Sequence, residues 1–471
     1  MARLNNYNIM KAAVWYTVGN ILIRGVSFFA LPLFTGLMST YDYGVYSVYT
    51  SYLSLFETFV LFGLSSTVSL AKFTDGLDDD RYLTTALVIP PLLTLVAGVG
   101  INLYLGVNGS LLSMSPILWN FLLVNAAITA VAQIMQARLI LDGRYQLYIA
   151  YSALTTLGNL GLSLLLCYTV FRTHDVYMAR VIGNCVASAV GAALLYGCTG
   201  FQKRIQHSYF PQAFRWGVPL LFHTLATVVL TQTDRILIQN LDGYSSAGIY
   251  GVSVTIIVIP LTLQSSFSSA WQPWFFNELE QKHYPAIRRM NHLYILLFAV
   301  ITAELCLIAP EVIHIFTNEA YWDSVYSLVP LFISVMGEML YSIPCSLEYY
   351  HKKTTYIMSG TLACTACNIV LDVVFILNFG YIAAAYATML SKLLLFLFHY
   401  LLSLRVDKEP LFQWRYVAGS LVFLGGINLL TVTRVDDLLT RGVLFFAIGL
   451  AFLWGVWKNR NELLALLRAK Q

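Results

Sequence analysis

Apolar stretches of about 20 residues, separated by short polar breaks, fill almost the whole sequence. They begin near residues 12, 43, 83, 116, 146, 176, 216, 248, 292, 325, 355, 380, 415 and 440. A helix of about 20 residues crosses the hydrocarbon core of a bilayer, and it satisfies its own backbone hydrogen bonds there. The pattern therefore predicts an all-α integral membrane protein with about fourteen transmembrane helices.

Composition supports this prediction and excludes other classes of protein. Hydrophobic residues make up 58% of the 471 residues and charged residues only 11%, whereas soluble domains carry about 25% charge. The net charge of +4 comes without a basic cluster, so no nucleic-acid partner is expected. The polar breaks are too short to form a soluble domain. Membrane lipids are therefore expected as partners along most of the chain.

The positions of Lys and Arg predict the orientation of the chain, because positively charged loops stay on the cytoplasmic side. Most of the 28 basic residues fall at alternate breaks and at both ends of the sequence. The exceptions at breaks on the opposite side are Arg172, Arg180, Arg434 and Arg441. We therefore expect a multi-pass protein of the cytoplasmic (inner) membrane with both termini cytoplasmic, which requires an even number of helices.

Two short strings recur at nearly the same offset. Tyr41–Val48 resembles Ser245–Val252, 204 residues later, and Asn159–Leu162 resembles Asn368–Leu371, 209 residues later. Six predicted helices separate the copies, and because six is even, the two halves would have the same orientation in the membrane. The repeat predicts two parallel six-helix bundles, with a substrate path between them.

Several longer strings carry a family resemblance. They are Gly19–Pro32, the Tyr-Gly-Val-Tyr at 43–46, Thr233–Arg235 through Tyr250, Trp271–Trp274, and Lys352–Thr354 through Asn368 to Gly380. In their order and spacing the sequence resembles the polysaccharide-transport branch of the multidrug/oligosaccharidyl-lipid/polysaccharide exporter superfamily. That branch includes flippases for O-antigen and capsule repeat units.

The resemblance implies a fold, an activity and partners. The fold would resemble the multidrug exporters of the superfamily, with bundles at 1–205 and 206–405 and two additional helices and a cytoplasmic tail at 406–471. The activity would be translocation of undecaprenyl-diphosphate-linked oligosaccharide by alternating access, for O-antigen, capsule or exopolysaccharide biosynthesis. A polysaccharide polymerase and a chain-length regulator are the protein partners that such a role suggests.

Charged residues inside the predicted helices are the candidate site residues, because a charge at the bilayer centre costs about 2.5 to 3.5 kcal/mol on insertion scales. Arg24 and Glu57 lie about halfway along the first two helices, at similar depth. Arg24 could bind the diphosphate through its planar guanidinium, or it could form a structural pair with Glu57. Both residues are candidates for substrate binding in the cavity.

Asp234 and Arg235 are adjacent on the seventh predicted helix. Neighbouring positions point about 100° apart, so the two side chains cannot face the same cavity wall. We expect a structural or gating role for this pair.

The second half carries Glu304, Glu338 and Asp372, which are candidates for coupling transport to Na+ or H+. Lys392 is a further cavity candidate for substrate. An ion pair of Lys392 with Asp372 or Glu338 is the structural alternative.

Motifs of enzymes and cofactor sites are absent from the sequence. It contains no G-x-x-x-x-G-K-[ST] phosphate loop and no H-E-x-x-H or G-x-S-x-G string, so we expect no ATP hydrolysis, catalytic residue or cofactor. Cys364 and Cys367 have no second ligand pair, so no metal site is expected. The alternatives to a flippase are a cation-coupled antiporter of drugs or small molecules from the same superfamily, and a membrane-embedded glycan polymerase or ligase.

Overall fold

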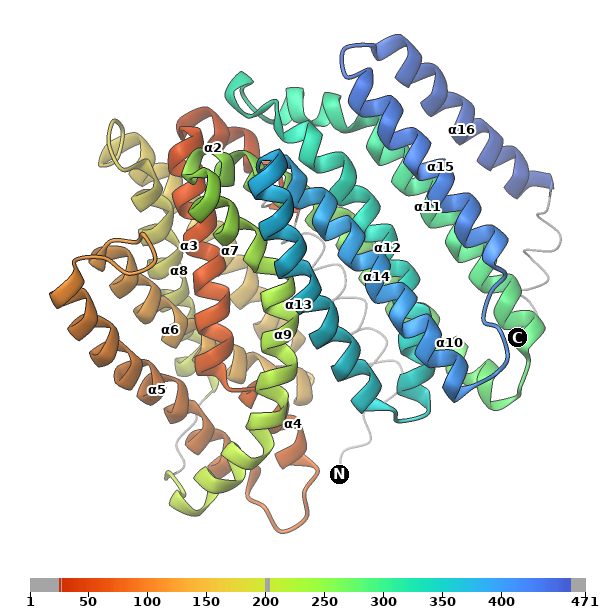
Figure 1. Cartoon of the computed structure of the whole chain (residues 1–471). Helices are drawn as coiled ribbons and strands as arrows, with labels where there is room; N and C mark the ends of the chain where they lie inside the picture. The colour runs from red at the N-terminus through yellow and green to blue at the C-terminus, as the bar shows by residue number, and fades with distance from the viewer. Residues whose placement is uncertain (1–24, 27, 200–203, 459–471) are drawn as a thin grey trace. The chain divides into compact units, whose positions relative to one another are not determined.

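The computed structural model describes residues 25–26, 28–199 and 204–458, and within them every element is helical (Figure 1). The helices are α2 (Leu31–Leu37), α3 (Thr40–Leu61), α4 (Leu64–Lys72), α5 (Asp79–Asn108), α6 (Pro116–Leu141), α7 (Tyr145–Thr169), α8 (Val176–Thr199), α9 (Phe210–Asp242), α10 (Tyr244–Glu280), α11 (Tyr284–Phe316), α12 (Ser324–Tyr350), α13 (Thr354–Phe379), α14 (Ile382–Val406), α15 (Trp414–Thr433) and α16 (Leu438–Lys458). Two 3-10 turns, η1 (His207–Tyr209) and η2 (Glu319–Tyr321), precede α9 and α12.

Twelve spans in the described part of the chain are long and apolar enough to cross a membrane. The first of them joins α3 and α4, and α9, which bends by 40° near residue 223, brings the number to thirteen if it counts as one span. Most of the first predicted helix, from residue 12, lies outside the described residues. The all-α membrane fold expected from the sequence is confirmed.

α9 and α11 begin clearly earlier than the apolar pattern predicts. They start at Phe210 and Tyr284, against expected starts near 216 and 292. The additional residues at the start of α11 include Arg288 and Arg289, which an apolar window rejects but a helix accommodates. Hydropathy therefore located the apolar core of each span and missed its polar end.

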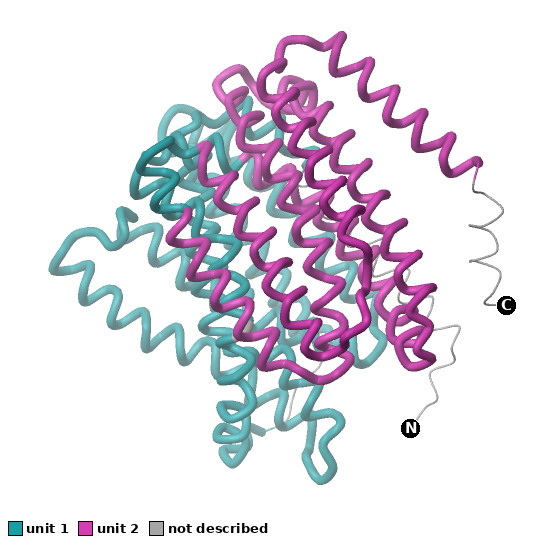
Figure 2. The backbone as a smooth tube through the Cα atoms, turned by 45° about the vertical axis from the view of Figure 1, so that its right-hand side comes forward, with its two compact units in different colours: residues 1–251, 372–381 teal, residues 252–371, 382–471 magenta. Residues whose placement is uncertain are grey.

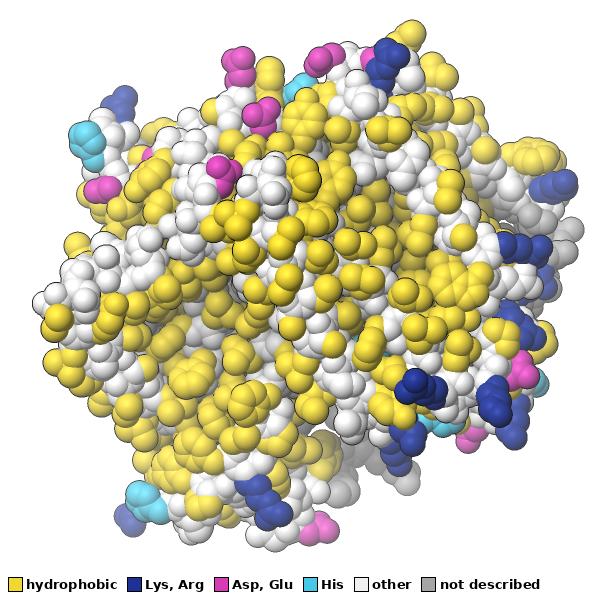
Figure 3. All heavy atoms as spheres, viewed as in Figure 1, with side chains coloured by type: hydrophobic (Ala, Val, Ile, Leu, Met, Phe, Trp, Pro, Cys, Tyr) yellow, Lys and Arg dark blue, Asp and Glu magenta, His cyan; other side chains and the backbone are white. Residues whose placement is uncertain are grey.

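Hydrophobic side chains cover most of the face drawn in Figure 3, and charged side chains gather toward the ends of the helices. Examples of exposed apolar residues are Val107 (84% exposed), Leu439 (80%) and Phe446 (68%). Water would disfavour such a surface, whereas lipid solvates it. The chain is accordingly a multi-pass membrane protein.

The chain forms two compact units, coloured separately in Figure 2. Unit 1 contains residues 1–251 and 372–381, and unit 2 contains residues 252–371 and 382–471. The sequence predicted a different division, into bundles that end at residues 205 and 405. That division was based on sequence repeats, whereas the units are defined by contacts in the fold, so it remains a prediction.

In unit 1, α3 packs against α6, α8 and α9, and α7 packs along α8. The α7–α8 contact is close because Gly183 and Gly191 of α8 face Ser163 and Thr155 of α7, where an added methyl group would overlap the partner side chain. Small residues of this kind permit the close approach on which helix association in lipid depends.

The two copies of the first sequence repeat are in contact with each other in unit 1. Gly44 of α3 and Gly248 of α10, which are 204 residues apart, lie in contact. A methyl group on Gly44 would overlap the carbonyl oxygen of Tyr244, and one on Gly248 would overlap that of Thr40. Because Thr40 and Tyr244 are themselves 204 residues apart, each copy makes the same contact with the other. The repeated Gly is thus a position where two helix backbones touch.

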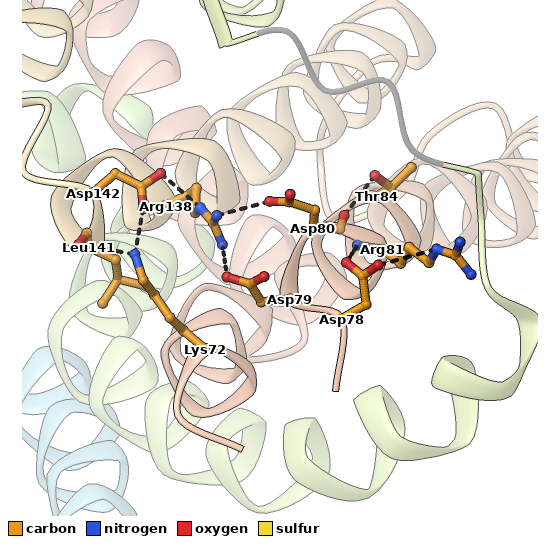
Figure 4. Close-up of polar contacts among 9 residues, drawn as sticks. All are labelled: Lys72, Asp78, Asp79, Asp80, Arg81, Thr84, Arg138, Leu141 and Asp142. Atoms are coloured by element: carbon orange, nitrogen blue, oxygen red, sulfur yellow. Dashed lines mark hydrogen bonds and ion pairs between the residues drawn. The ribbon is translucent and has the colours of Figure 1, made fainter. Parts of the chain in front are cut away.

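A network of ion pairs joins the ends of α4, α5 and α6 (Figure 4). Arg138 donates to Asp79 at 2.7 Å, Asp80 at 2.9 Å and Asp142 at 2.8 Å. Lys72 adds a contact of 2.5 Å to Asp142. Three acidic residues share two cations here, so the network holds three helix ends together at one end of unit 1.

In unit 2, α12 and α14 form the most extensive helix pair, and α11 packs against α12, α15 and α16. Arg441 of α16, only 3% exposed, donates to both carboxylate oxygens of Glu311 on α11 at 2.6 Å each. It also donates to the carbonyl oxygens of Leu307, Arg434 and Val435. This bidentate pair ties the last helix to the rest of unit 2.

An apolar groove of about 570 Å³ runs between α11, α15 and α16. Its walls include Leu293, Leu297, Phe423, Ile448 and Phe452. The groove is large enough for part of a hydrocarbon chain, and no charged side chain lines it.

Candidate functional site

Two of the predicted acidic residues, Asp234 and Asp372, come together in unit 1. The carboxylate of Asp234 on α9 accepts a hydrogen bond of 2.6 Å from the hydroxyl of Tyr250 on α10. Asp372 on α13 is close enough to Asp234 for the two carboxylates to interact electrostatically. Asp234 is 6% exposed and Asp372 is fully buried. We call Asp234, Tyr250 and Asp372 the acid cluster.

The acid cluster has the chemistry of a cation or proton site. Two carboxylates side by side repel one another unless a proton or a cation lies between them. Neither oxygen of Asp372 has a hydrogen-bond donor among the described protein groups. Oxygen ligands of this kind suit Na+, and a shared proton would satisfy the pair equally well.

Arg235 lies next to the acid cluster. Its guanidinium donates to the side-chain oxygen of Gln232 on the same helix, and it is close enough to Asp234 and Tyr250 to interact with both electrostatically. The structural or gating role of the pair remains a prediction.

The structure describes only one member of the proposed Arg24–Glu57 pair, because Arg24 lies outside the described residues. Glu57 of α3 is half-buried, and it accepts a hydrogen bond of 2.5 Å from Gln133 of α6. Glu57 therefore has a neutral partner in α6.

Lys392 and Glu338 form the ion pair that the sequence left as an alternative. The ammonium group of Lys392 on α14 lies 2.6 Å from the carboxylate of Glu338 on α12, and the side chains are 14% and 28% exposed. Gly337 permits this approach, since an added methyl group would press on Lys392. As long as the pair persists, neither residue is free to bind a substrate or an ion.

Glu304 stands apart from the other charges of unit 2. Both of its carboxylate oxygens are enclosed without a hydrogen-bond partner among the described groups, and Oε1 faces Gly449 of α16. An enclosed carboxylate without a partner can take up a proton, so a role of Glu304 in ion coupling is physically reasonable and stays a prediction.

Sequence reasoning missed three sets of charged residues that make specific contacts in the fold. Glu348 of α12 and His399 of α14 are fully buried and lie 2.8 Å apart. Arg441 pairs with Glu311, and Arg180 packs against aromatic rings, although both arginines had served only as markers of topology. Glu348 escaped notice because a charge next to a helix end is normally at the interface. The partners in the Glu348–His399 and Glu311–Arg441 contacts are 51 and 130 residues apart, and the local sequence gives no signal of such contacts.

Known structures with the same fold are membrane transporters. The lipid II flippase MurJ in an inward closed conformation aligns with 96% of this chain and 100% of its own, with a TM-score of 0.73 and 15% identity. An inward-facing multidrug resistance transporter of the MATE family aligns with 84% of this chain and 99% of its own, with a TM-score of 0.58 and 13% identity. A MOP-superfamily transporter from Pyrococcus furiosus aligns with 83% and 94%, with a TM-score of 0.52 and 14% identity.

These likenesses establish an all-α membrane transporter fold and leave the cargo open. Comparison with curated protein sequences finds no match. The family model described as "Polysaccharide biosynthesis protein" matches residues 9–278. Since this range is more than half of the sequence, the chain belongs to that family of polysaccharide biosynthesis proteins.

Proposed function

We propose that this protein is a flippase that moves undecaprenyl-diphosphate-linked oligosaccharide repeat units across the cytoplasmic membrane by alternating access. The observation that carries the proposal is the coincidence of family and fold. The chain belongs to a polysaccharide biosynthesis family, and nearly its whole length aligns with the whole length of a lipid II flippase. The products would supply a surface polysaccharide such as O-antigen, capsule or exopolysaccharide.

The apolar groove of unit 2 supports a lipid-linked cargo. It lies between α11 and the two helices that follow the predicted bundles, and its walls are hydrophobic throughout. An isoprenoid chain has to remain in an apolar environment while its head group crosses, and a groove of this kind offers one.

The acid cluster supports coupling to a cation. Asp234, Tyr250 and Asp372 present oxygen atoms to one another in the interior, where a charge is costly without a partner. Binding and release of Na+ or H+ there would supply the free energy that the cargo gradient lacks.

The first alternative is a cation-coupled antiporter of drugs or other small molecules. The likeness to a multidrug transporter and the acid cluster both fit that function. A glycan polymerase or ligase is less well supported, because the described loops between the helices hold few residues for a catalytic site. Recruitment of a polymerase and a chain-length regulator remains an expectation.

The test is restoration of surface glycan in a host strain that lacks its own flippase and makes this protein's repeat unit. The wild-type chain should restore the glycan, and Asp372→Asn should lose most of that activity at equal expression. Asp75→Asn is the control, because it removes an exposed carboxylate of the same unit that lies outside the acid cluster. No restoration by the wild-type chain, together with acquired drug resistance, would favour the antiporter.

A further inference from the structure

Arg180 lies one turn inside α8, against aromatic side chains of two other helices in unit 1. Its guanidinium carbon is 4.1 Å from the ring centre of Phe34 on α2 and 3.9 Å from that of Tyr46 on α3. The ring of Tyr43 is 5.8 Å away. Phe34 and Tyr46 are 3% and 8% exposed, so they form rigid walls for the cation.

No acidic residue of the described chain neutralises this cation directly. Among the described residues Arg180 has no ion pair and no hydrogen-bond acceptor, and its Nε atom is buried without a partner. Arg138 and Arg441, by contrast, each bind carboxylates within 3 Å. A guanidinium stays charged at any relevant pH, and burying its Nε–H group without an acceptor is costly.

We propose that Arg180, Phe34 and Tyr46 form an anion site that binds the diphosphate head group of the lipid carrier. The proposal rests on the proposed flippase function. The rings hold the guanidinium in place, and its planar N–H groups match the oxygen atoms of a phosphate. The ring contacts also reduce the loss of side-chain freedom on binding, because the cation is held before the ligand arrives.

The charges around this site set its affinity. Asp42 lies in the first turn of α3, one turn from Tyr46, and Asp175 directly precedes α8. Both acids are nearer to the helix ends than Arg180, on the side that the basic-residue pattern predicts to be external. Their repulsion weakens the binding of an anion, which suits a site that has to release its ligand after each cycle.

The experiment is binding of undecaprenyl diphosphate to the purified full-length chain in uncharged detergent, with inorganic pyrophosphate as a second probe. Arg180→Ala should weaken binding of the lipid by roughly 10- to 100-fold, the range expected for lost charge-assisted hydrogen bonds. Arg180→Lys should recover part of the loss, because it restores the charge without the planar fork. The matched control is Arg172→Ala, which removes an exposed arginine eight residues away in the sequence.

Tyr46→Leu provides a second variant, which keeps the charge and removes one ring. It should also weaken binding, by a smaller factor, and it keeps the proposal testable if Arg180→Ala does not fold. Unchanged affinity in both variants, an equal loss in Arg172→Ala, or Arg180-dependent binding of pyrophosphate without binding of the lipid would each overturn the proposal. Competition of pyrophosphate with the lipid would support it, because it locates recognition in the head group.

The two proposals fail separately. If wild-type chain and Arg180→Ala restore surface glycan equally and bind the lipid equally, the anion site is wrong and the flippase function stands. If the wild-type chain binds the lipid through Arg180 but restores no glycan from its own repeat unit, the site stands and the function is wrong.

Discussion

Some charged side chains inside the described part of this protein have a partner of opposite charge, and others do not. Lys392 and Arg441 meet carboxylates of neighbouring helices, whereas Asp372 meets another acid. The first arrangement satisfies itself, whereas the oxygen atoms of Asp372 have no hydrogen-bond donor among the described groups and suit a proton or a metal ion. Asp372 is therefore the position where added cations should change the properties of the protein.

We expect sodium chloride to raise the unfolding temperature of the purified wild-type chain relative to choline chloride at equal ionic strength. A ligand that binds only the folded state stabilises it in proportion to the logarithm of its concentration. Asp372→Asn should remove this sodium dependence, because an amide in place of the carboxylate ends the need for a cation. Glu57→Gln should retain it. Protection by acidification instead of sodium, again lost in Asp372→Asn, would identify the proton as the ligand, and protection by neither would contradict a cation site.

The helices of this chain are held together by glycine contacts and ion pairs, which a hydropathy analysis does not detect. Apolar periodicity predicts that α3, α10 and α16 exist, but their packing depends on backbone approach at Gly44 and Gly248 and on an ion pair across 130 residues. The repeat at offset 204 marks both glycines in the sequence alone. Its physical meaning, a contact between the two copies, is visible only in the fold.

Gly44→Ala should destabilise the described conformation by about 1 to 3 kcal/mol or more, because the new methyl group would overlap the backbone of α10. Gly248→Ala should have a similar effect through the backbone of α3. Gly161→Ala is the matched control, since nothing lies within 4 Å of the added methyl group and alanine favours a helix. The measurement is the thermal unfolding midpoint in detergent. Equal midpoints for all three variants would show that α3 and α10 do not touch here.

Arg441→Leu should loosen α16, because the substitution leaves the Glu311 carboxylate, which is 33% exposed, without its bidentate partner. Breaking a fully buried pair costs about 3 to 5 kcal/mol, and the exposure of Glu311 lowers that cost. Limited proteolysis should then cut the loop between α15 and α16 faster than in the wild-type chain. Arg434→Leu removes a 66% exposed arginine of the same loop, whose contact with Asp437 is 3.9 Å, and it should have little effect. Equal cleavage in the two variants would show that Arg441 does not anchor the helix.

At the scale of the whole molecule, the sequence predicted those features that follow from a single physical requirement. Lipid requires apolar helices, so the spans after the first could be located from composition, and their order matched a transporter fold. Sites depend on which helices meet, and that choice rests on packing among residues far apart in the sequence. The meeting of Asp234 with Asp372, 138 positions later, and the burial of Glu348 with His399 both belong to this second kind.

The orientation of the chain is the remaining whole-molecule prediction, and labelling of single cysteines can test it. In a version that lacks the seven native cysteines, Asp75→Cys and His351→Cys should react with a membrane-impermeant thiol reagent only after the cells are opened. Ser110→Cys and Arg172→Cys should react in intact cells, because they occupy breaks with few basic residues. All four positions are exposed, so access depends on the side of the membrane alone.

The reverse labelling pattern would invert the chain and place Arg180 at the cytoplasmic side. The anion site would then meet the carrier where the repeat unit is loaded, and the charge pattern would no longer explain the topology. The predicted pattern would instead place Arg180 at the external end of unit 1. A diphosphate bound there would have already crossed, and the acids Asp42 and Asp175 would favour its departure.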